Sequence, residues 1–226
     1  MAPRYHSFIP KNATERVTAR YPSGAKERAE YLVGDEVVGT RYFHETGEPS
    51  LEIPLRHGRT HGTMYRWDTP RVLLSAEPYV DGLAHGTARQ WQDGALVGTY
   101  RMVRGTGLDL WWGRRADGAR VLSEARHLRE GHREGFEWWI EDNQRRVYEE
   151  NHYREGHPHG IERRWNHEGR LRRGYPKYWV NGAQVSKRGY LAACKRDPTL
   201  PPFQEHDNAP ERHFPPEVAA ALGPME

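Results

Sequence analysis

A pair of closely spaced glycines recurs six times along the chain, at intervals of 23 to 26 residues, and this period constrains the fold more than any other feature. The first glycine of each pair is Gly34, Gly58, Gly82, Gly105, Gly131 or Gly156. The second is Gly39, Gly62, Gly86, Gly107, Gly135 or Gly160. A period in this range is typical of repeat architectures, in which each unit packs on its neighbours.

Large aromatic residues stand at a fixed distance after most of the second glycines. Five residues after the glycine, four of the six units have tryptophan: Trp67, Trp91, Trp112 and Trp165. Positions three and five after the glycine share one face of a strand, because side chains alternate with period two. Turn signals such as Asp93-Gly94 follow. We therefore expect each unit to be a β-hairpin whose tryptophan points inward.

The period predicts an all-β fold, an elongated antiparallel β-hairpin solenoid in which about twelve to fourteen short strands form a meander. We expect a lead-in over residues 1–19 and six to seven repeats over 20–174. A small α and irregular cap follows over 175–226. A single hairpin is marginally stable in water, so each unit depends on stacking against the next.

The predicted cap contains a hairpin, a short helix and a proline-rich tail. Asn181-Gly182 favours a tight turn, and Ser186 is placed to cap a helix that runs to about Arg196. Tyr190, Leu191 and Cys194 are expected on the packed side of that helix. Residues 216–222 predict a last short helix that begins at its proline. We expect this tail to cover the final strand edge, since open edges invite aggregation.

Two units carry the repeat pattern most clearly. They read YVDGLAHGTARQWQDGAL, from Tyr79 to Leu96, and YREGHPHGIERRWNHEGRL, from Tyr153 to Leu171. The pattern resembles the MORN-type repeat, whose bacterial variant occurs in proteins labelled YwqK-like antitoxins, and the resemblance covers residues 20–174. It implies an elongated, non-catalytic β-hairpin array that is used for binding. The residues that the motif fixes are structural, so the resemblance assigns no functional residue.

Composition restricts the compartment. The chain has 226 residues, one cysteine, Cys194, and no apolar run long enough for a signal segment or for the roughly 18 residues of a membrane span. A single cysteine favours a reducing compartment, so we expect a cytoplasmic protein. The formal charge of +3 allows an acidic partner without demanding one.

Thirteen histidines raise the question of metal binding or catalysis. His61, His85 and His159 all directly precede a second glycine, so they follow the repeat. Zinc needs three or four converging ligands, and no cysteine or carboxylate lies at a sequence spacing from His157 and His159 that is typical of a zinc site. We interpret the histidines as scaffold, with metal binding as the alternative, and expect no cofactor and no catalytic residue.

Carboxylate pairs and one cysteine are the other candidate catalytic residues. Glu134 and Glu137, and Glu149 and Glu150, fall in expected strands opposite many arginines, so cross-strand ion pairing accounts for them. Cys194 stands beside two basic residues that would favour its thiolate, but packing on an apolar helix face is the simpler interpretation. We therefore predict that the protein is not an enzyme.

The sequence favours a protein-binding scaffold, with an antitoxin or immunity-like role as its sharpest form. The alternative is a nucleic-acid-binding protein, because arginines gather around Trp165 and such combinations bind single strands by charge and stacking. Acidic neighbours and the small net charge favour a solvated face instead. The arginines that would make the contact are Arg163, Arg164, Arg170, Arg172 and Arg173.

Overall fold

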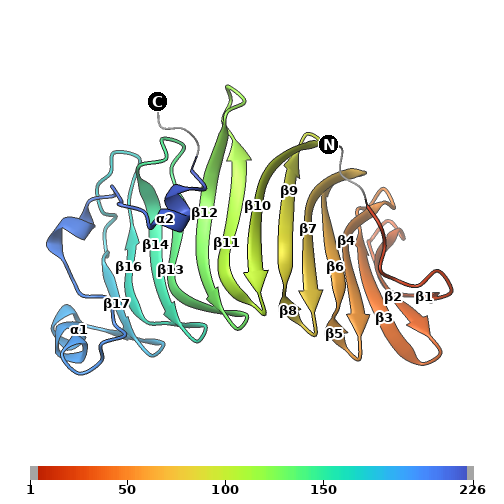
Figure 1. Ribbon diagram of the computed structural model, residues 1–226, viewed down its shortest axis with the longest axis horizontal. Coiled ribbons are helices and arrows are strands. Elements are labelled where there is room, and N and C mark those ends of the chain that lie inside the picture. The colour runs from red at the N-terminus through yellow and green to blue at the C-terminus, as the bar shows by residue number, and fades with distance from the viewer. Residues whose placement is uncertain (1–4, 223–226) are drawn as a thin grey trace. The chain divides into compact units, whose positions relative to one another are not determined.

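The computed structural model describes residues 5–222 and is all-β with a small helical C-terminal part (Figure 1). Eighteen strands lie within these residues, and each runs antiparallel to the strands it pairs with. The predicted class, a meander of antiparallel hairpins with a small helical cap, is confirmed. No helix in the described part of the chain is long and apolar enough to cross a bilayer.

The chain forms two compact units, which divide between Gly105 and Thr106. In the first unit, successive hairpins pair strand to strand from β1 to β10. Its strands are β1 Thr14–Arg20, β2 Lys26–Val33, β3 Glu36–Phe43, β4 Pro49–Arg56, β5 Arg59–Thr60, β6 Gly62–Thr69, β7 Val72–Val80, β8 Leu83–Ala84, β9 Gly86–Gln92 and β10 Ala95–Val103. The strand β1 begins within the expected lead-in, ends one residue beyond it and forms a hairpin with β2.

The second unit continues the same pattern and adds the helical part. Its strands are β11 Thr106–Arg114, β12 Arg120–Arg129, β13 His132–Ile140, β14 Val147–Arg154, β15 His157–Pro158, β16 Gly160–Arg164, β17 Lys177–Val180 and β18 Ala183–Val185. Its helices are α1 Lys187–Cys194, a 3₁₀ turn Glu205–Asn208 and α2 Pro216–Ala219. The hairpin predicted around Asn181-Gly182 is β17–β18.

The strand count exceeds the expected twelve to fourteen because three long strands are interrupted and because β17 and β18 lie in the expected cap, outside the repeats. The interruptions fall at His61, His85 and His159, which leave the two-residue pieces β5, β8 and β15. At each of these positions the histidine N–H still donates to the neighbouring strand, as in His159 N–H to His152 O at 2.9 Å. The interruption is therefore a local bulge of one strand.

The first glycines and the tryptophans of the repeat occupy the places that the sequence predicted. The first glycines Gly34, Gly58, Gly82, Gly131 and Gly156 all lie in hairpin turns with positive φ, between +59° and +89°. The tryptophans Trp67, Trp91, Trp112 and Trp165 are all buried, and Trp165 is only 1% exposed. Glycine adopts a positive φ without steric cost, which is why the turns keep it.

The second glycines give room to a side chain from elsewhere. A Cβ on Gly62 would lie 2.8 Å from the Phe8 ring, and one on Gly160 would lie 2.5 Å from the His152 Cβ. Gly62, Gly86, Gly135 and Gly160 also have positive φ. These positions start or lie near the start of strands and are not hairpin turns.

The C-terminal helices largely follow the prediction. Ser186 caps α1 by accepting a hydrogen bond from Gly189 N at 3.2 Å, and Tyr190 is fully buried. The helix ends at Cys194, two residues before the expected Arg196, and α2 ends before Leu222. The packing expected for Leu191 is wrong: it is 41% exposed, because a helix this short buries the side of Tyr190, Ala193 and Cys194.

The tail lies across a face of the sheet in the second unit (Figure 1). Its backbone pairs with residues 145–147 at the start of β14, as in Val147 N to Pro210 O at 2.9 Å, so the edge that it covers belongs to β14 instead of the expected final strand. Phe214 packs edge-on against Trp138 at 5.4 Å between ring centroids, and Arg212 lies over the Trp165 ring at 5.0 Å. Trp112 Nε1 donates to Ala221 O at 3.2 Å. A buried indole N–H needs a hydrogen-bond acceptor, and backbone carbonyl groups of the tail accept from Trp112 and Trp165.

Replacing Trp165 with alanine should lower the free energy of unfolding by about 3–5 kcal/mol, because a fully buried ring leaves a cavity. The indole N–H would also no longer donate to Asn208 O, now at 2.7 Å. Chemical denaturation measures the change. Tyr148→Ala is the control, since Tyr148 is 44% exposed and its loss should change stability by about 0.5 kcal/mol or less. Equal effects would contradict the inward assignment of Trp165.

Candidate functional site

Six of the hairpin turns are each hydrogen-bonded to a side chain of the preceding hairpin. The first residue of the turn has a positive φ and donates its backbone N–H to that side chain. The pairs, donor first, are His57 to Glu36 Oε1, Asp81 to His61 Nδ1, Arg104 to His85 Nδ1, Glu130 to Thr106 Oγ1, Glu155 to Glu134 Oε2 and Asn181 to His159 Nδ1, with N···acceptor distances of 2.8–3.3 Å. We call this series the turn ladder.

The turn ladder explains why histidine follows the repeat. A histidine just before the second glycine presents Nδ1 as an acceptor for the turn N–H. Threonine or glutamate at the same position accepts the same hydrogen bond through a side-chain oxygen. In the first repeat this position holds Val38, which has no acceptor, and Glu36 replaces it. Within residues 5–222, no group of three or more His, Cys, Asp or Glu side chains is arranged to hold a metal ion.

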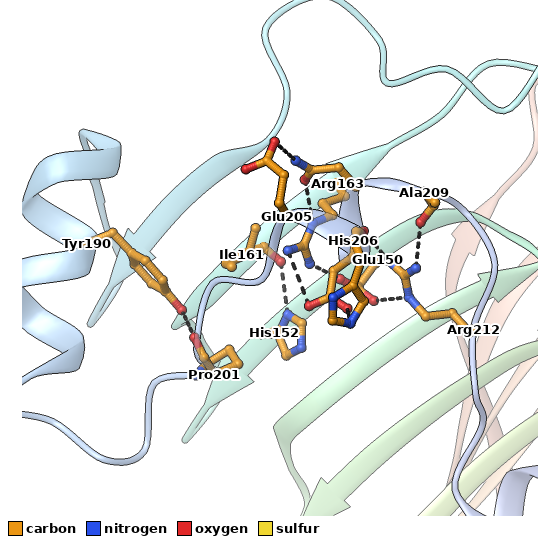
Figure 2. Close-up of polar contacts among 12 residues, drawn as sticks. Glu150, His152, Ile161, Arg163, Tyr190, Pro201, Glu205, His206, Ala209 and Arg212 are labelled. Atoms are coloured by element: carbon orange, nitrogen blue, oxygen red, sulfur yellow. Dashed lines mark hydrogen bonds and ion pairs between the residues drawn. The ribbon is translucent and has the colours of Figure 1, made fainter.

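A buried charge cluster joins the tail to the sheet of the second unit (Figure 2). Glu150 on β14 is 3% exposed and lies opposite Arg163 on β16, to which it is ion-paired. Its other carboxylate oxygen accepts from Arg212 Nε at 2.7 Å and from Trp138 Nε1 at 2.8 Å. The carboxylate therefore has partners on three segments of the chain.

The surroundings keep Glu150 ionised. Burial by itself would raise its pKa, but the positive charges of Arg212 and Arg163 outweigh burial and lower the pKa to about 2. Arg212 is anchored further by donating to Ala209 O at 2.7 Å and Asp207 O at 3.0 Å. These contacts make Glu150 a structural group, because both carboxylate oxygens already accept hydrogen bonds.

The first unit uses a similar arrangement with its N-terminal segment. Glu52 is fully buried and accepts from Arg41 Nε at 2.7 Å, which lies opposite it on the neighbouring strand. Tyr5 Oη donates to Glu52 Oε2 at 2.6 Å and Ser7 Oγ to Oε1 at 2.9 Å. Tyr5 also packs edge-on against Trp67. A terminal segment thus completes a buried glutamate–arginine pair in each unit.

Most of the five arginines that would contact nucleic acid are already engaged within the chain. Arg163 is 2% exposed and ion-paired to Glu150, so its assignment as a contact residue is corrected. Arg164 is ion-paired to Glu149 at 3.0 Å, and Arg170 to Glu168 at 3.0 Å. Arg172 Nε donates to Trp165 O at 3.1 Å, and Arg173 is exposed.

The carboxylate pairs behave as the sequence predicted, with one exception. Glu149 and Glu150 are paired to the arginines opposite them on β16, and Glu137 is paired to Arg126 on β12 at 2.9 Å. Glu134 instead accepts the turn N–H of Glu155. Burial raises the pKa of Glu137, and Arg133 and Arg126 oppose this rise.

A groove of about 710 Å³ opens in the second unit between the sheet and the segment 198–202. Its apolar lining is formed by aromatic rings and prolines. The lining residues are Thr106, His127, Arg129, Glu134, Gly135, Phe136, Trp138, His152, Tyr153, Arg154, His159, Pro198, Thr199, Leu200, Pro201 and Pro202. This volume lies in the range of about 300–1,000 Å³ that is typical of ligand pockets.

A stack of rings forms one side of the groove. Phe136 and Trp138 are alternate residues of β13 and lie on the same face, with ring centroids 4.0 Å apart and planes 14° from parallel. His127 of β12 lies on the other side of Phe136, at 6.0 Å. The opposite side is built by prolines of the 198–202 segment, which carries no repeat signal, so the sequence did not reveal this groove.

Hydrogen bonds join His159, Thr199 and Asp197 in series, as in a catalytic triad. Their direction is opposite to the one that catalysis needs, because the histidine donates to the hydroxyl group. His159 Nδ1 accepts the Asn181 N–H, so the ring proton is on Nε2, which donates to Thr199 Oγ1 at 3.1 Å. The Thr199 hydroxyl donates to Asp197 Oδ1 at 2.5 Å. A general base needs a free nitrogen facing the hydroxyl proton, and His159 does not have one.

No protein-family model, curated protein or solved structure matches this chain. The resemblance of the repeat to the MORN type therefore stays a prediction.

Replacing Glu150 with glutamine should lower the free energy of unfolding by about 3–5 kcal/mol at neutral pH. The variant keeps the shape but leaves Arg212 buried without a counter-charge and Arg163 with only Asp207 at 3.8 Å, which is strongly destabilising. Urea denaturation of the purified variant measures the loss. Glu168→Gln is the matched control, because Glu168 is exposed and pairs only at the surface. A loss no larger than that of the control would show that the cluster does not hold the tail.

The stability of the protein should fall as the pH drops below about 6.5, the ordinary histidine value. Burial lowers the pKa of His159 despite the opposing charge of Asp197. The unfolded chain therefore binds this proton more tightly than the folded chain, and acid favours unfolding. Unfolding free energies at pH 5 to 7.5 test this. His159→Gln, which cannot titrate, should show a shallower fall, and an identical slope would contradict the assignment.

Proposed function

We propose that this protein is a non-catalytic, protein-binding repeat scaffold of the cytoplasm, and that the groove of the second unit is its binding site. The observation that carries this proposal is a large aromatic and proline-lined groove in which His159, Arg154 and Glu134 are already engaged in structural hydrogen bonds. A site of this kind offers contact surface and shape.

The composition of the groove favours a protein partner. Aromatic residues and arginine are enriched at the centres of protein interfaces, and the groove has Phe136, Trp138 and Arg129 among its lining residues. A nucleic-acid partner would need a continuous positive track. The ion pairing of Arg164 and Arg170 and the burial of Arg163 count against such a track here.

The sharpest form of the proposal is an antitoxin or immunity-like role, in which the partner is a toxic protein that the scaffold binds and neutralises. The resemblance of the repeat to bacterial arrays with that label supports it. Co-expression with a small protein encoded beside this one would test it, since survival should depend on an intact groove.

Affinity capture with the tagged full-length protein tests the site. Pro202 is exposed at the groove, so Pro202→Glu adds a charge there with little effect on folding. We expect one protein to co-purify with the wild type, and about tenfold less with Pro202→Glu, since a buried unpaired charge costs at least about 1.4 kcal/mol of binding. Pro22→Glu, in the exposed β1–β2 turn of the first unit, is the matched control and should capture normally.

Two results would overturn the proposal. Equal capture of the partner by Pro202→Glu and Pro22→Glu would place the binding site outside the groove. Recovery of nuclease-sensitive material in place of a protein, with affinity that falls steeply as salt rises, would favour the nucleic-acid alternative.

A further inference from the structure

We infer that the groove binds an acidic segment of the partner that carries an aromatic residue, with the ring inside the groove and a neighbouring carboxylate at Arg129. This inference rests on the proposed function and specifies the chemistry of the partner. Three features of the groove carry it: its ring and proline walls, its unpaired arginine and the fixed orientation of His152.

The walls suit a planar ring. Phe136 and Trp138 provide stacked aromatic surface on one side, and Pro198, Leu200 and Pro201 line the other. Aromatic side chains bury large areas and gain additional stabilisation from offset or edge contacts with other rings. The volume of about 710 Å³ exceeds what one ring fills, so it admits the flanking residues of a short peptide segment as well.

The charge at the rim selects an acidic segment. Arg154 is already engaged by Thr199 Oγ1 at 2.9 Å and by Asp197 at 3.6 Å. Glu134 is engaged by the turn N–H of Glu155. Arg129 is exposed, and no carboxylate within residues 5–222 lies within 4.0 Å of its guanidinium. The unsatisfied charge of the rim is therefore positive, and a planar guanidinium binds carboxylates well.

The orientation of His152 adds a polar contact. Its Nδ1 lies 2.9 Å from Ile161 O, which can only accept, so Nδ1 carries the proton (Figure 2). In the neutral ring Nε2 is then an acceptor, and His152 is among the lining residues. A tyrosine hydroxyl or a tryptophan N–H can donate to it, and phenylalanine cannot. The groove thus favours Tyr or Trp among acidic neighbours.

Titration of the full-length protein with three blocked tripeptides tests this inference. The probes are acetyl-Glu-Tyr-Glu-amide, acetyl-Lys-Tyr-Lys-amide and acetyl-Glu-Ala-Glu-amide, followed by NMR of the histidine ring signals. We expect the acidic tyrosine peptide to bind at least about tenfold more tightly than either of the others, because each of those lacks one of the two contacts. Its affinity should also weaken as salt screens the Arg129 contact.

Variants decide which residue selects the charge. Arg129→Gln should weaken binding of the acidic tyrosine peptide about three- to fivefold at low salt, which is the range for an exposed ion pair. Arg173→Gln, an exposed arginine outside the groove, should leave it unchanged. Equal effects of the two variants would overturn the role of Arg129.

The inference fails separately from the proposed function. Equal or tighter binding of the lysine or alanine peptide would overturn the stated chemistry, and so would the absence of binding by the acidic tyrosine peptide. The capture experiment would still identify a protein that depends on Pro202. Loss of both the peptide binding and the Pro202 dependence would remove the groove as the site.

Discussion

The hydrogen bond from each turn N–H to a side chain of the preceding hairpin is the contact on which the rest of the repeat depends. A hairpin turn with two residues at positive φ points N–H groups away from its own strands, and those groups need partners when the next hairpin packs against them. The turn ladder supplies one acceptor per hairpin within each unit. The following glycine N–H adds a second bond to a backbone carbonyl, as from Gly182 to Pro158 O at 2.8 Å. Because only an acceptor is required, histidine, threonine and glutamate all serve.

Buried glutamate–arginine pairs perform a second task, which is to bind the terminal segments to the sheet. Glu52 and Glu150 are each fixed by an arginine on the adjacent strand, and each keeps acceptor capacity for a segment far away in sequence. Tyr5 and Arg212 satisfy that capacity. A buried carboxylate without these donors would be unfavourable, so the terminal segments are integral parts of their units.

The groove is a consequence of this attachment. Segment 197–202 runs between α1, whose Tyr190 Oη donates to Pro201 O at 2.6 Å, and the tail that Glu150 holds. It is therefore positioned from both sides and stands next to the ring stack of β13 without filling the space above it. Rigid walls of this kind limit the ordering that binding requires, which favours a preformed site for a partner segment.

The sequence by itself determined the hairpins, their period and the inward tryptophans. These depend on local requirements: glycine where φ is positive, and alternation along a strand. It also predicted the cross-strand pairing of Glu149 and Glu150 and the cap at Ser186. It did not predict the burial of Arg163, the course of the tail over the face, or the groove. Those depend on contacts such as Arg212 with Glu150, 62 residues apart, and the non-repeating tail carries no period that would specify them. Only tertiary packing decided which charged residues are buried and where a partner can bind.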